Sequence, residues 1–588
     1  MQVSRLAKSV TFAACSPYSS VALRGLSSIS IMSRLFGGSF SEPKPKKVPS
    51  YLKVHGVEIQ DEFQWLKDRG SRAVRNYVKQ ENRYCDAVLS DTEAFQENLT
   101  NEMKDWFHKH FDDESVPEEL DGYIYYLSNP PKDSYLPVYC RRKISEDGSY
   151  GDPETILDQN ELKERYNYVS IPRIKISPSG RYIGFLLDKS NTGMYTLFVT
   201  EAHEGIINFI DAIPNVVNFE WGCDDLTIYY SRPDEQNRPF AVLMHKTCQS
   251  VLTDVVLHEE KDERFIVDVS ATKDREFITI NCNSRSTSEV SIVDIKDGSF
   301  VCKPLHPRQQ GMEYYVDHRD DQFYIITNAD EKNYRVEKHS FSVLPSFDSS
   351  DFCCTRLEIQ SKDGTHIPVT LFHHKDLKKE GSNPLLLHAP MVSMSTWVLI
   401  GGGELGREWY LDGKLQNKHK GFEDFEACAK ALHNLGYSNP QLTAARGTSA
   451  GGLIVGAVCN RSPELFKAVI LKVPFLDILT SMLDPSLPLT VQEYEEWGEP
   501  GSNESDFHYI KSYCPYQNIK DQVYPSVMVT TAMNDDRVPY WLPLKWVARL
   551  RDQLSHHAQG EKPLVVCHVE YYGGHSETEG VYHRIEKK

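Results

Sequence analysis

The chain has no cysteine pairs of the kind that bind metal or form a disulfide framework. Its 13 cysteines include no C-x-x-C motif, whereas zinc sites and small secreted domains usually show such spacings. Scattered cysteines favour a reducing compartment. We therefore interpret Cys85 and Cys428 as small apolar core residues, and we expect no metal or organic cofactor.

The chain also lacks an excess of positive charge, since Asp and Glu number 83 against 65 Lys and Arg. The formal net charge is −18 at pH 7, which would repel a polyanion and makes nucleic acid an unexpected partner. Hydrophobic residues make up 40% and charged residues 25% of the chain, as in ordinary globular proteins. The 588 residues suffice for two or more domains, and nothing in them indicates an oligomeric state.

The first 41 residues contain no Asp or Glu but carry Arg5, Lys8, Arg24 and Arg34 among many Ser, Ala and Leu. This composition is typical of a mitochondrial transit peptide, whose removal would change the net charge from −18 to −22. The alternative is a disordered N-terminus with translation starting at Met32. The expected location is mitochondrial in the first case and cytoplasmic in the second.

A second stretch, Pro384–Gly403, lacks Asp, Glu, Lys and Arg altogether and approaches the length of a membrane span. It contains Pro390, His388 and three glycines. Buried strands of a parallel sheet explain it better, because such strands are apolar on both faces. We expect no membrane span.

Three regions that differ in their pattern of apolar and turn residues follow the N-terminus. Residues 42–110 show helical spacing of apolar residues, beginning at Asp61–Asp68. Residues 111–350 alternate turns with short aromatic or β-branched strands. Similar segments start at residues 122, 180, 225, 274 and 321, separated by 58, 45, 49 and 47 residues. A period of about 40–50 residues is typical of propeller blades, so we predict an all-β propeller of about five blades, with an evenly spaced β-sandwich as the alternative.

Residues 351–588 read as an α/β domain. A hairpin turning at Asp363-Gly364 is followed by alternating strands and helices, which implies a mostly parallel, doubly wound sheet. The expected elements are strands at Leu385–Leu387, Leu442–Ala445, Ala468–Val473, Ser526–Thr531 and Leu564–Glu570, and helices at Gly421–Leu435 and Leu542–Leu554.

A catalytic triad can be placed on this pattern. Gly447-Thr-Ser-Ala-Gly451 fits G-x-S-x-G, the sharp strand-to-helix turn that exposes a nucleophilic serine. Asp535 and His575 each follow a predicted strand and occur in the order Ser, Asp, His of an α/β-hydrolase. Ser449 would be the nucleophile, His575 the base, and Asp535 the acid that fixes the histidine tautomer. The backbone N–H of Ala450 would be one oxyanion donor. Singly, Asp535 is as easily a turn residue and His575 a loop histidine.

At these residues the C-terminal 240 or so positions resemble the prolyl oligopeptidase family of serine peptidases, in particular its oligopeptidase B and prolyl-endopeptidase-like branches. The matching segments are Gly401–Gly406, Arg446–Gly452, Val473–Asp477, Met482–Leu489, Glu495–Gly498, Tyr513–Tyr516 and Tyr540–Arg549. The resemblance implies a hydrolase domain capped by a seven-bladed propeller, with the N-terminal segment around Trp65-Leu66 packed on the hydrolase domain.

The resemblance also implies roles for individual residues. It places the triad on Ser449, Asp535 and His575. Arg537 matches an arginine that binds substrate carbonyls. Glu493 and Glu495 match an acidic pair that receives a basic P1 side chain, and two carboxylates can pair with a guanidinium in fork geometry. The alternative for the glutamates is a charged helix surface.

Three features depart from the family pattern. The segment after Leu385–Leu387, residues 388–396, has no tyrosine to give a second oxyanion donor and is too short for an ordinary crossover, which needs about 10–12 residues. About five blades replace seven. The chain ends 13 residues after His575, where the family has a final helix. These departures are those of a splice variant or an incomplete gene model.

The sequence therefore predicts a serine-type endopeptidase that cleaves short peptides through an acyl-enzyme and favours a basic P1 residue. Two alternatives stay open. One is an esterase or thioesterase with the same triad. The other is a catalytically impaired variant, lacking its oxyanion loop, that acts as a binding module through its propeller.

Overall fold

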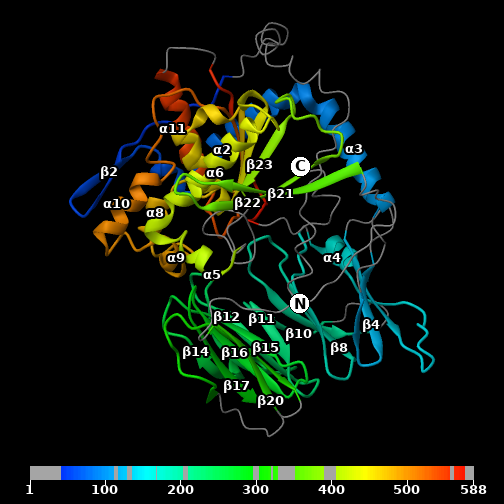
Figure 1. Ribbon diagram of the computed structural model, residues 1–588. Coiled ribbons are helices and arrows are strands. Elements are labelled where there is room, and N and C mark those ends of the chain that lie inside the picture. The colour runs from blue at the N-terminus through cyan, green and yellow to red at the C-terminus, as the bar shows by residue number, and fades with distance from the viewer. Residues whose placement is uncertain are drawn as a thin grey trace.

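The computed structural model describes most of the chain. The described residues are 41–110, 117–128, 136–166, 168–202, 209–295, 303–319, 322–328, 351–389, 405–556 and 562–575, without the side chains of residues 106–110. A mixed α/β part and an all-β part lie one above the other in Figure 1. This is the predicted pairing of a hydrolase domain with a propeller.

The N-terminal segment begins with a hairpin rather than a helix. Strands β1 (Ser50–Val54) and β2 (Val57–Asp61) pair antiparallel across His55 and Gly56. Both turn residues have positive φ, 47° and 78°, which a two-residue hairpin turn needs and a helix forbids. Helical structure follows at η3 (Gln64–Lys67), α2 (Arg72–Leu89), η4 (Ser90–Thr92) and α3 (Glu93–His110).

Helix α2 packs on the hydrolase domain. Its buried face carries Val74, Tyr77 and Val78, which join the core of that domain. The Asn82 amide exchanges two hydrogen bonds of 2.8 Å with the backbone of Val569 on strand β27. These contacts attach the N-terminal segment beside the strand that leads to His575.

The all-β part consists, among the described residues, of four four-stranded antiparallel sheets and a two-stranded one. In every sheet the repeated segment found in the sequence forms the second strand, namely β4, β8, β12, β16 and β20. The strands are β3 (Glu118–Leu120), β4 (Tyr123–Ser128), β5 (Val138–Lys143), β6 (Glu154–Asp158), β7 (Ile174–Ile176), β8 (Tyr182–Leu187), β9 (Thr196–Glu201), β10 (Phe209–Pro214), β11 (Asn218–Trp221), β12 (Thr227–Pro233), β13 (Pro239–Lys246), β14 (Val255–Glu259), β15 (Ile266–Ala271), β16 (Phe277–Asn283), β17 (Ser288–Asp294), β18 (Lys303–Pro304), β19 (Tyr314–Arg319) and β20 (Gln322–Thr327).

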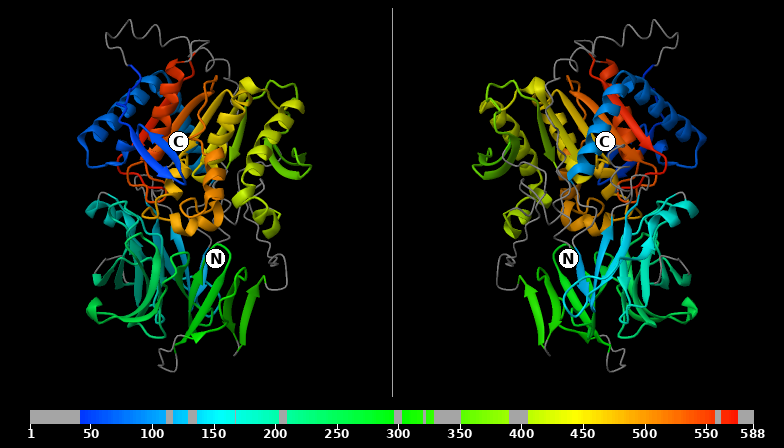
Figure 2. Two further views of the ribbon diagram at one scale, coloured as in Figure 1. Left: turned by 90° about the vertical axis from the view of Figure 1, so that its left-hand side faces the viewer. Right: turned by 90° about the vertical axis from the view of Figure 1, so that its right-hand side faces the viewer.

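The blades are joined by hydrophobic clusters between neighbouring sheets and by polar contacts at their ends. The side chain of Asn218 in the third blade donates to the Val269 carbonyl of the fourth at 2.9 Å. The backbone N–H of Lys273 in the fourth blade donates to Asp317 of the fifth at 3.0 Å. Figure 2 shows the sheets arranged side by side below the hydrolase domain. Helix α4 (Gln159–Arg165) and η5 (Val251–Thr253) lie in their connections.

The hydrolase domain contains a five-stranded, all-parallel sheet in the order β23-β24-β25-β26-β27. Its five strands coincide with those predicted from the sequence, and the antiparallel hairpin β21–β22 precedes them with its turn at Asp363-Gly364. The strands are β21 (Phe352–Gln360), β22 (His366–His374), β23 (Leu385–Ala389), β24 (Thr443–Thr448), β25 (Ala468–Lys472), β26 (Ser526–Ala532) and β27 (Val565–Glu570).

Helices cover this sheet, and the largest core cluster lies between it and the packed helices. The predicted helices are present as α6 and α11. The helices are α5 (Arg407–Leu411), η7 (Leu415–Asn417), α6 (His419–Asn434), η8 (Pro440–Leu442), α7 (Ala450–Arg461), η9 (Pro463–Leu465), α8 (Ile478–Met482), α9 (Thr490–Trp497), α10 (Glu504–Tyr513) and α11 (Trp541–His556).

Several sequence predictions concern residues outside the described ranges. They are the predicted transit peptide (1–41) except its last residue, the end of the propeller region at 329–350, the shortened oxyanion segment (388–396) from residue 390 on, and the chain end after residue 575. Within the described part, no helix combines the length and the hydropathy that a membrane crossing requires.

Candidate active site

Ser449 lies on a sharp turn between strand β24 and helix α7. Its φ of 54° and ψ of −122° are unusual for a residue with a side chain, as the strained serine of a nucleophile elbow requires. Small neighbours permit this turn. A Cβ on Gly447 would lie 2.5 Å from the Gly451 carbonyl, and one on Gly452 would lie 2.4 Å from Cβ of Pro474. Close packing therefore explains Gly447 of the motif and the adjacent Gly452.

The structure brings Ser449, His575 and Asp535 together in one hydrogen-bonded relay. His575 Nε2 lies 3.1 Å from Ser449 Oγ, and its Nδ1 lies 2.9 and 2.8 Å from the two carboxylate oxygens of Asp535. All three residues are at most 9% exposed. They follow the carboxyl ends of β24, β26 and β27, which meet at one edge of the parallel sheet.

Asp535 is held by its own loop. Its Oδ1 accepts the backbone N–H groups of Arg537 at 3.0 Å and Val538 at 2.8 Å. The adjacent Asp536 makes no such contact with the histidine among the described residues, and burial together with the charge of Asp535 raises its pKa. The two neighbouring aspartates are thus distinguished by geometry, which the sequence Asn534-Asp-Asp could not do alone.

The backbone N–H of Ala450 is available at the position expected for an oxyanion donor. Ala450 is the first residue of α7, and the first N–H groups of a helix have no intrahelical acceptor. A partial positive charge gathers at such a helix end. The loop that would supply a second donor in the family falls in residues 390–404, outside the described ranges.

A pocket of about 270 Å³ opens beside Ser449. Its wall is mostly apolar, but it also includes charged groups from both domains. The lining residues are Arg285, Tyr410, Ser449, Ala450, Phe475, Ser481, Met482, Leu487, Pro488, Leu489, Thr490, Glu493, Glu496, Trp497, Arg537, Val538 and Pro539. Because Arg285 lies between β16 and β17, the pocket is closed on one side by the propeller.

The predicted acidic pair is split by the structure. Glu493 lines the pocket, forms an ion pair with Arg285 and accepts the Trp497 indole N–H at 2.8 Å. Glu495 does not line the pocket, but accepts a hydrogen bond of 2.9 Å from the hydroxyl of Ser286, the neighbour of Arg285 in the propeller. Helix geometry explains this, because residues two apart lie on different faces of α9.

A different glutamate, Glu496, accompanies Glu493 at the pocket. It is 3% exposed, accepts the Tyr410 hydroxyl at 2.6 Å and is paired with Lys418. Burial opposes its charge, but Lys418 and the hydrogen bonds outweigh burial and lower its pKa. Sequence reasoning missed Glu496 and Arg285. The i, i+3 spacing of Glu493 and Glu496 was a usable signal for the first, whereas no local signal marks the second.

Arg537 is exposed and lines the mouth of the same pocket. Its backbone N–H donates to the Asp535 carboxylate, which holds Arg537 close to the triad. The structure thus places Arg537 at the same pocket as Ser449, and its predicted role in binding a carbonyl stays a prediction. Glu495 does not line that pocket.

Known proteins resemble both parts of the chain. The model of the prolyl oligopeptidase N-terminal beta-propeller domain matches residues 43–346, and that of the prolyl oligopeptidase family matches residues 398–587. Protease 2 of Moraxella lacunata is 29% identical over 87% of this chain and 92% of its own length. A prolyl endopeptidase-like protein of Gallus gallus is 31% identical over 69% and 73%.

Solved structures share the fold. Oligopeptidase B from Leishmania major matches with a TM-score of 0.85 at 23% identity, covering 93% of this chain and 97% of that one. Oligopeptidase B from Trypanosoma brucei, solved with covalently bound antipain, matches with a TM-score of 0.84 at 22% identity, with the same coverage. At such identities the likeness establishes the architecture alone.

Proposed function

Because this chain belongs to the prolyl oligopeptidase family of serine-type peptidases, we propose that it cleaves short peptides through an acyl-enzyme formed on Ser449. The observation that carries the proposal is the relay from Ser449 through His575 to Asp535 beside a pocket. The relatives at comparable length are named as peptidases or peptidase-like proteins.

In this mechanism Ser449 Oγ donates its proton to His575 Nε2 as it attacks the scissile carbonyl carbon. Asp535 stabilises the imidazolium and holds its Nδ1–H. The Ala450 N–H donates to the developing oxyanion, the kind of interaction whose loss typically costs about 10²–10³ in rate. His575 then protonates the leaving amine, and water repeats the sequence to release the acid.

Access by short peptides follows from the position of the pocket. Propeller residues close one side of it, with Arg285 in the wall and Asn191 hydrogen-bonded to the Tyr572 carbonyl near His575. A folded protein cannot approach a serine enclosed between two domains, whereas an extended segment can. Arg537 is proposed to hold a backbone carbonyl of that segment.

The proposal extends to a basic P1 side chain, in the pocket lined by Glu493 and Glu496. Both carboxylates already have protein partners, Arg285 and Lys418 respectively. An incoming guanidinium would therefore bind Glu493 by displacing Arg285. The pairing of Glu493 with a basic P1 side chain can be measured with substrates that differ only in the charge of that side chain.

The first test is labelling of the full chain with a fluorophosphonate probe, beside Ser449→Ala. We expect labelling of the native chain and none of the variant, because only an activated serine reacts. Matched peptide, ester and thioester substrates with Arg, Pro or neutral P1 then separate peptidase from esterase. A folded native chain that stays unlabelled would overturn the proposal and favour the binding-module alternative.

A further inference from the structure

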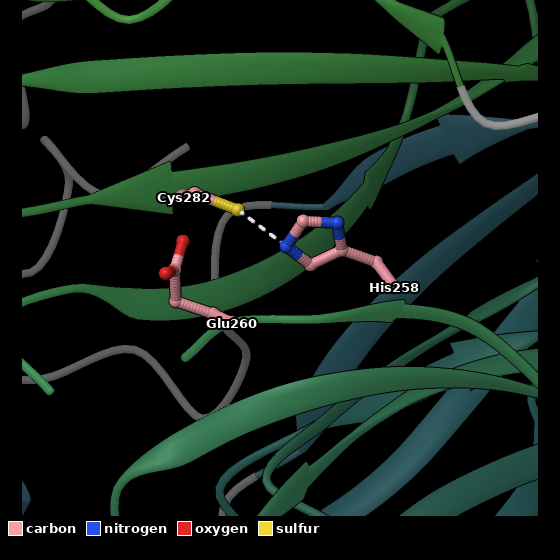
Figure 3. Close-up of side chains that lie close together, drawn as sticks. All are labelled: His258, Glu260 and Cys282. Atoms are coloured by element: carbon pink, nitrogen blue, oxygen red, sulfur yellow. Dashed lines mark hydrogen bonds between the residues drawn. The ribbon is translucent and has the colours of Figure 1, made fainter. Parts of the chain in front are cut away.

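Three side chains with metal-ligand chemistry meet between the third and fourth blades, far along the chain from the triad. His258 on β14 and Glu260 just after it are two residues apart, and Cys282 lies on β16. Figure 3 shows the Cys282 sulfur pointing at the His258 ring, with the Glu260 carboxylate beside them. The mechanism proposed above uses none of these residues.

The spacing of the three groups suits one small cation. His258 Nε2 lies 3.2 Å from Cys282 Sγ, and one ligand atom from each residue lies within 4.8 Å of the others. Metal bonds of about 2.0–2.3 Å to N, O and S place tetrahedral ligand atoms about 3.3–3.8 Å apart. A cation at the centre therefore requires only small movements of the side chains.

The chemical state of the cluster also suits a cation. His258 is half-buried, and the unprotonated nitrogen of an imidazole offers a lone pair to a cation. Cys282 is 1% exposed and Glu260 is 7% exposed. Glu260 and Glu289 carry two negative charges against the single positive charge of Arg308. A divalent cation bound by Cys282 as thiolate would leave the whole cluster neutral.

Neighbouring groups orient the Glu260 carboxylate by hydrogen bonds and leave it lone pairs with which to bind a cation. The Glu260 Oε2 accepts from Arg308 at 2.6 Å, and its Oε1 accepts the Asp262 N–H at 2.8 Å. Arg308 is itself held over the Phe265 ring at 3.7 Å. Each carboxylate oxygen keeps a second lone pair, and such supporting hydrogen bonds are usual around metal ligands.

We propose that His258, Glu260 and Cys282 bind one Zn²⁺ ion, which links the third blade to the fourth. A set of imidazole nitrogen, thiolate and carboxylate oxygen favours Zn²⁺ over the hard cations Mg²⁺ and Ca²⁺. Water would complete the four-coordinate shell that Zn²⁺ prefers. No sequence pattern marks this site, because its ligands come from two blades and lack any paired-cysteine spacing.

The test uses the full chain without a polyhistidine tag, stripped of metal and kept reduced with a phosphine. Co²⁺ replaces Zn²⁺ in such sites and reports a thiolate ligand by an intense near-ultraviolet band. We expect this band to saturate at one equivalent and to be displaced by Zn²⁺. We also expect Zn²⁺ to raise the Tm of the native chain, since it binds only the folded state.

Two variants decide whether the cluster is responsible. Cys282→Ser should abolish the sulfur band, and His258→Asn, at a half-buried position, should weaken Zn²⁺ binding at least tenfold. Cys248→Ser removes an exposed thiol and should change neither. Absence of the band in the native chain, or equal binding by His258→Asn, would overturn the proposal. Binding without a sulfur band would also overturn it, and would point to the cluster of Asp274, Glu276 and His318.

Discussion

At the scale of single residues, the site depends on which of two adjacent aspartates faces the histidine. The chain places Asp535 against His575 Nδ1, while Asp536 packs near Gly193 of the propeller. A carboxylate at Nδ1 keeps the proton there and leaves Nε2 free to accept from Ser449. Residue type alone does not separate the two acids, but their contacts do.

This difference predicts contrasting effects of two matched substitutions. Asp535→Asn should lower kcat by about 10⁴, because an amide favours the wrong histidine tautomer while keeping the geometry. Asp536→Asn removes the adjacent, less buried carboxyl, which forms no hydrogen bond with the ring among the described residues, and should lower kcat by less than about tenfold. Steady-state hydrolysis of one peptide by both variants checks this. Equal losses would contradict the assignment of Asp535.

At the scale of elements, the strand β24, the turn at Ser449 and the helix α7 form a unit that tolerates little extra volume. Gly452 lies in the first turn of α7, and an added Cβ would meet Cβ and Cα of Pro474 at 2.4 and 2.8 Å. Those atoms belong to a rigid ring and to the backbone, so they cannot move aside cheaply. Gly501 has nothing within 4 Å of the corresponding position.

We therefore expect Gly452→Ala to destabilise the hydrolase domain by about 1–3 kcal/mol, the usual cost of overpacking, and to slow fluorophosphonate labelling. Gly501→Ala should stay within about 0.5 kcal/mol of the native chain, as surface substitutions do. Thermal unfolding and labelling rates of the two variants give the comparison. A Gly452→Ala chain with native stability and labelling would show that the elbow is less tightly packed than its contacts indicate.

Most elements could be predicted because their signals are local. The five parallel strands, the hairpin turn at Asp363-Gly364 and the repeated second strand of each blade all carry apolar runs next to turn residues. The hairpin at residues 50–61 lies in a region for which the sequence predicts helix. Its turn depends on positive φ angles at His55 and Gly56, and in the sequence this dipeptide looks like part of an ordinary loop.

The triad could also be predicted from local signals, since each member follows a strand of the parallel sheet and the carboxyl ends of these strands meet. The residues that line the pocket could not be predicted in this way. Which face of α9 is buried decides between Glu495 and Glu496, and this depends on Lys418 and Tyr410, more than 70 residues away. The metal cluster depends likewise on how one blade lies against the next.

At the scale of the whole molecule, the propeller forms part of the wall of the pocket beside Ser449. Arg285 reaches from the β16–β17 connection to Glu493 of α9 across 208 residues of sequence. In the proposed binding mode, a P1 arginine would need the position that Arg285 occupies. Two guanidinium groups cannot both pair fully with one carboxylate, so the domain contact and a basic substrate compete for Glu493.

This competition predicts how P1 preference responds to the propeller. Arg285→Ala leaves Glu493 half-buried beside Trp497 without its cation, and an unpaired buried charge is costly until a substrate cation restores the pair. The ratio of kcat/KM for a P1 Arg peptide to that for its P1 citrulline analogue should then rise about tenfold, equivalent to about 1.4 kcal/mol. Citrulline keeps the shape of arginine without its charge, so the ratio isolates the ionic contribution.

Two companion variants identify the source of any change. Ser286→Ala alters the same propeller connection through Glu495 alone and should leave the ratio at its native value. Glu493→Gln combined with Arg285→Ala should cancel the gain, because the carboxylate that the substrate would use is gone. If Arg285→Ala leaves the ratio unchanged while the triad still labels, the P1 side chain does not reach Glu493, and the apolar wall formed by Phe475 and Trp497 selects the substrate instead.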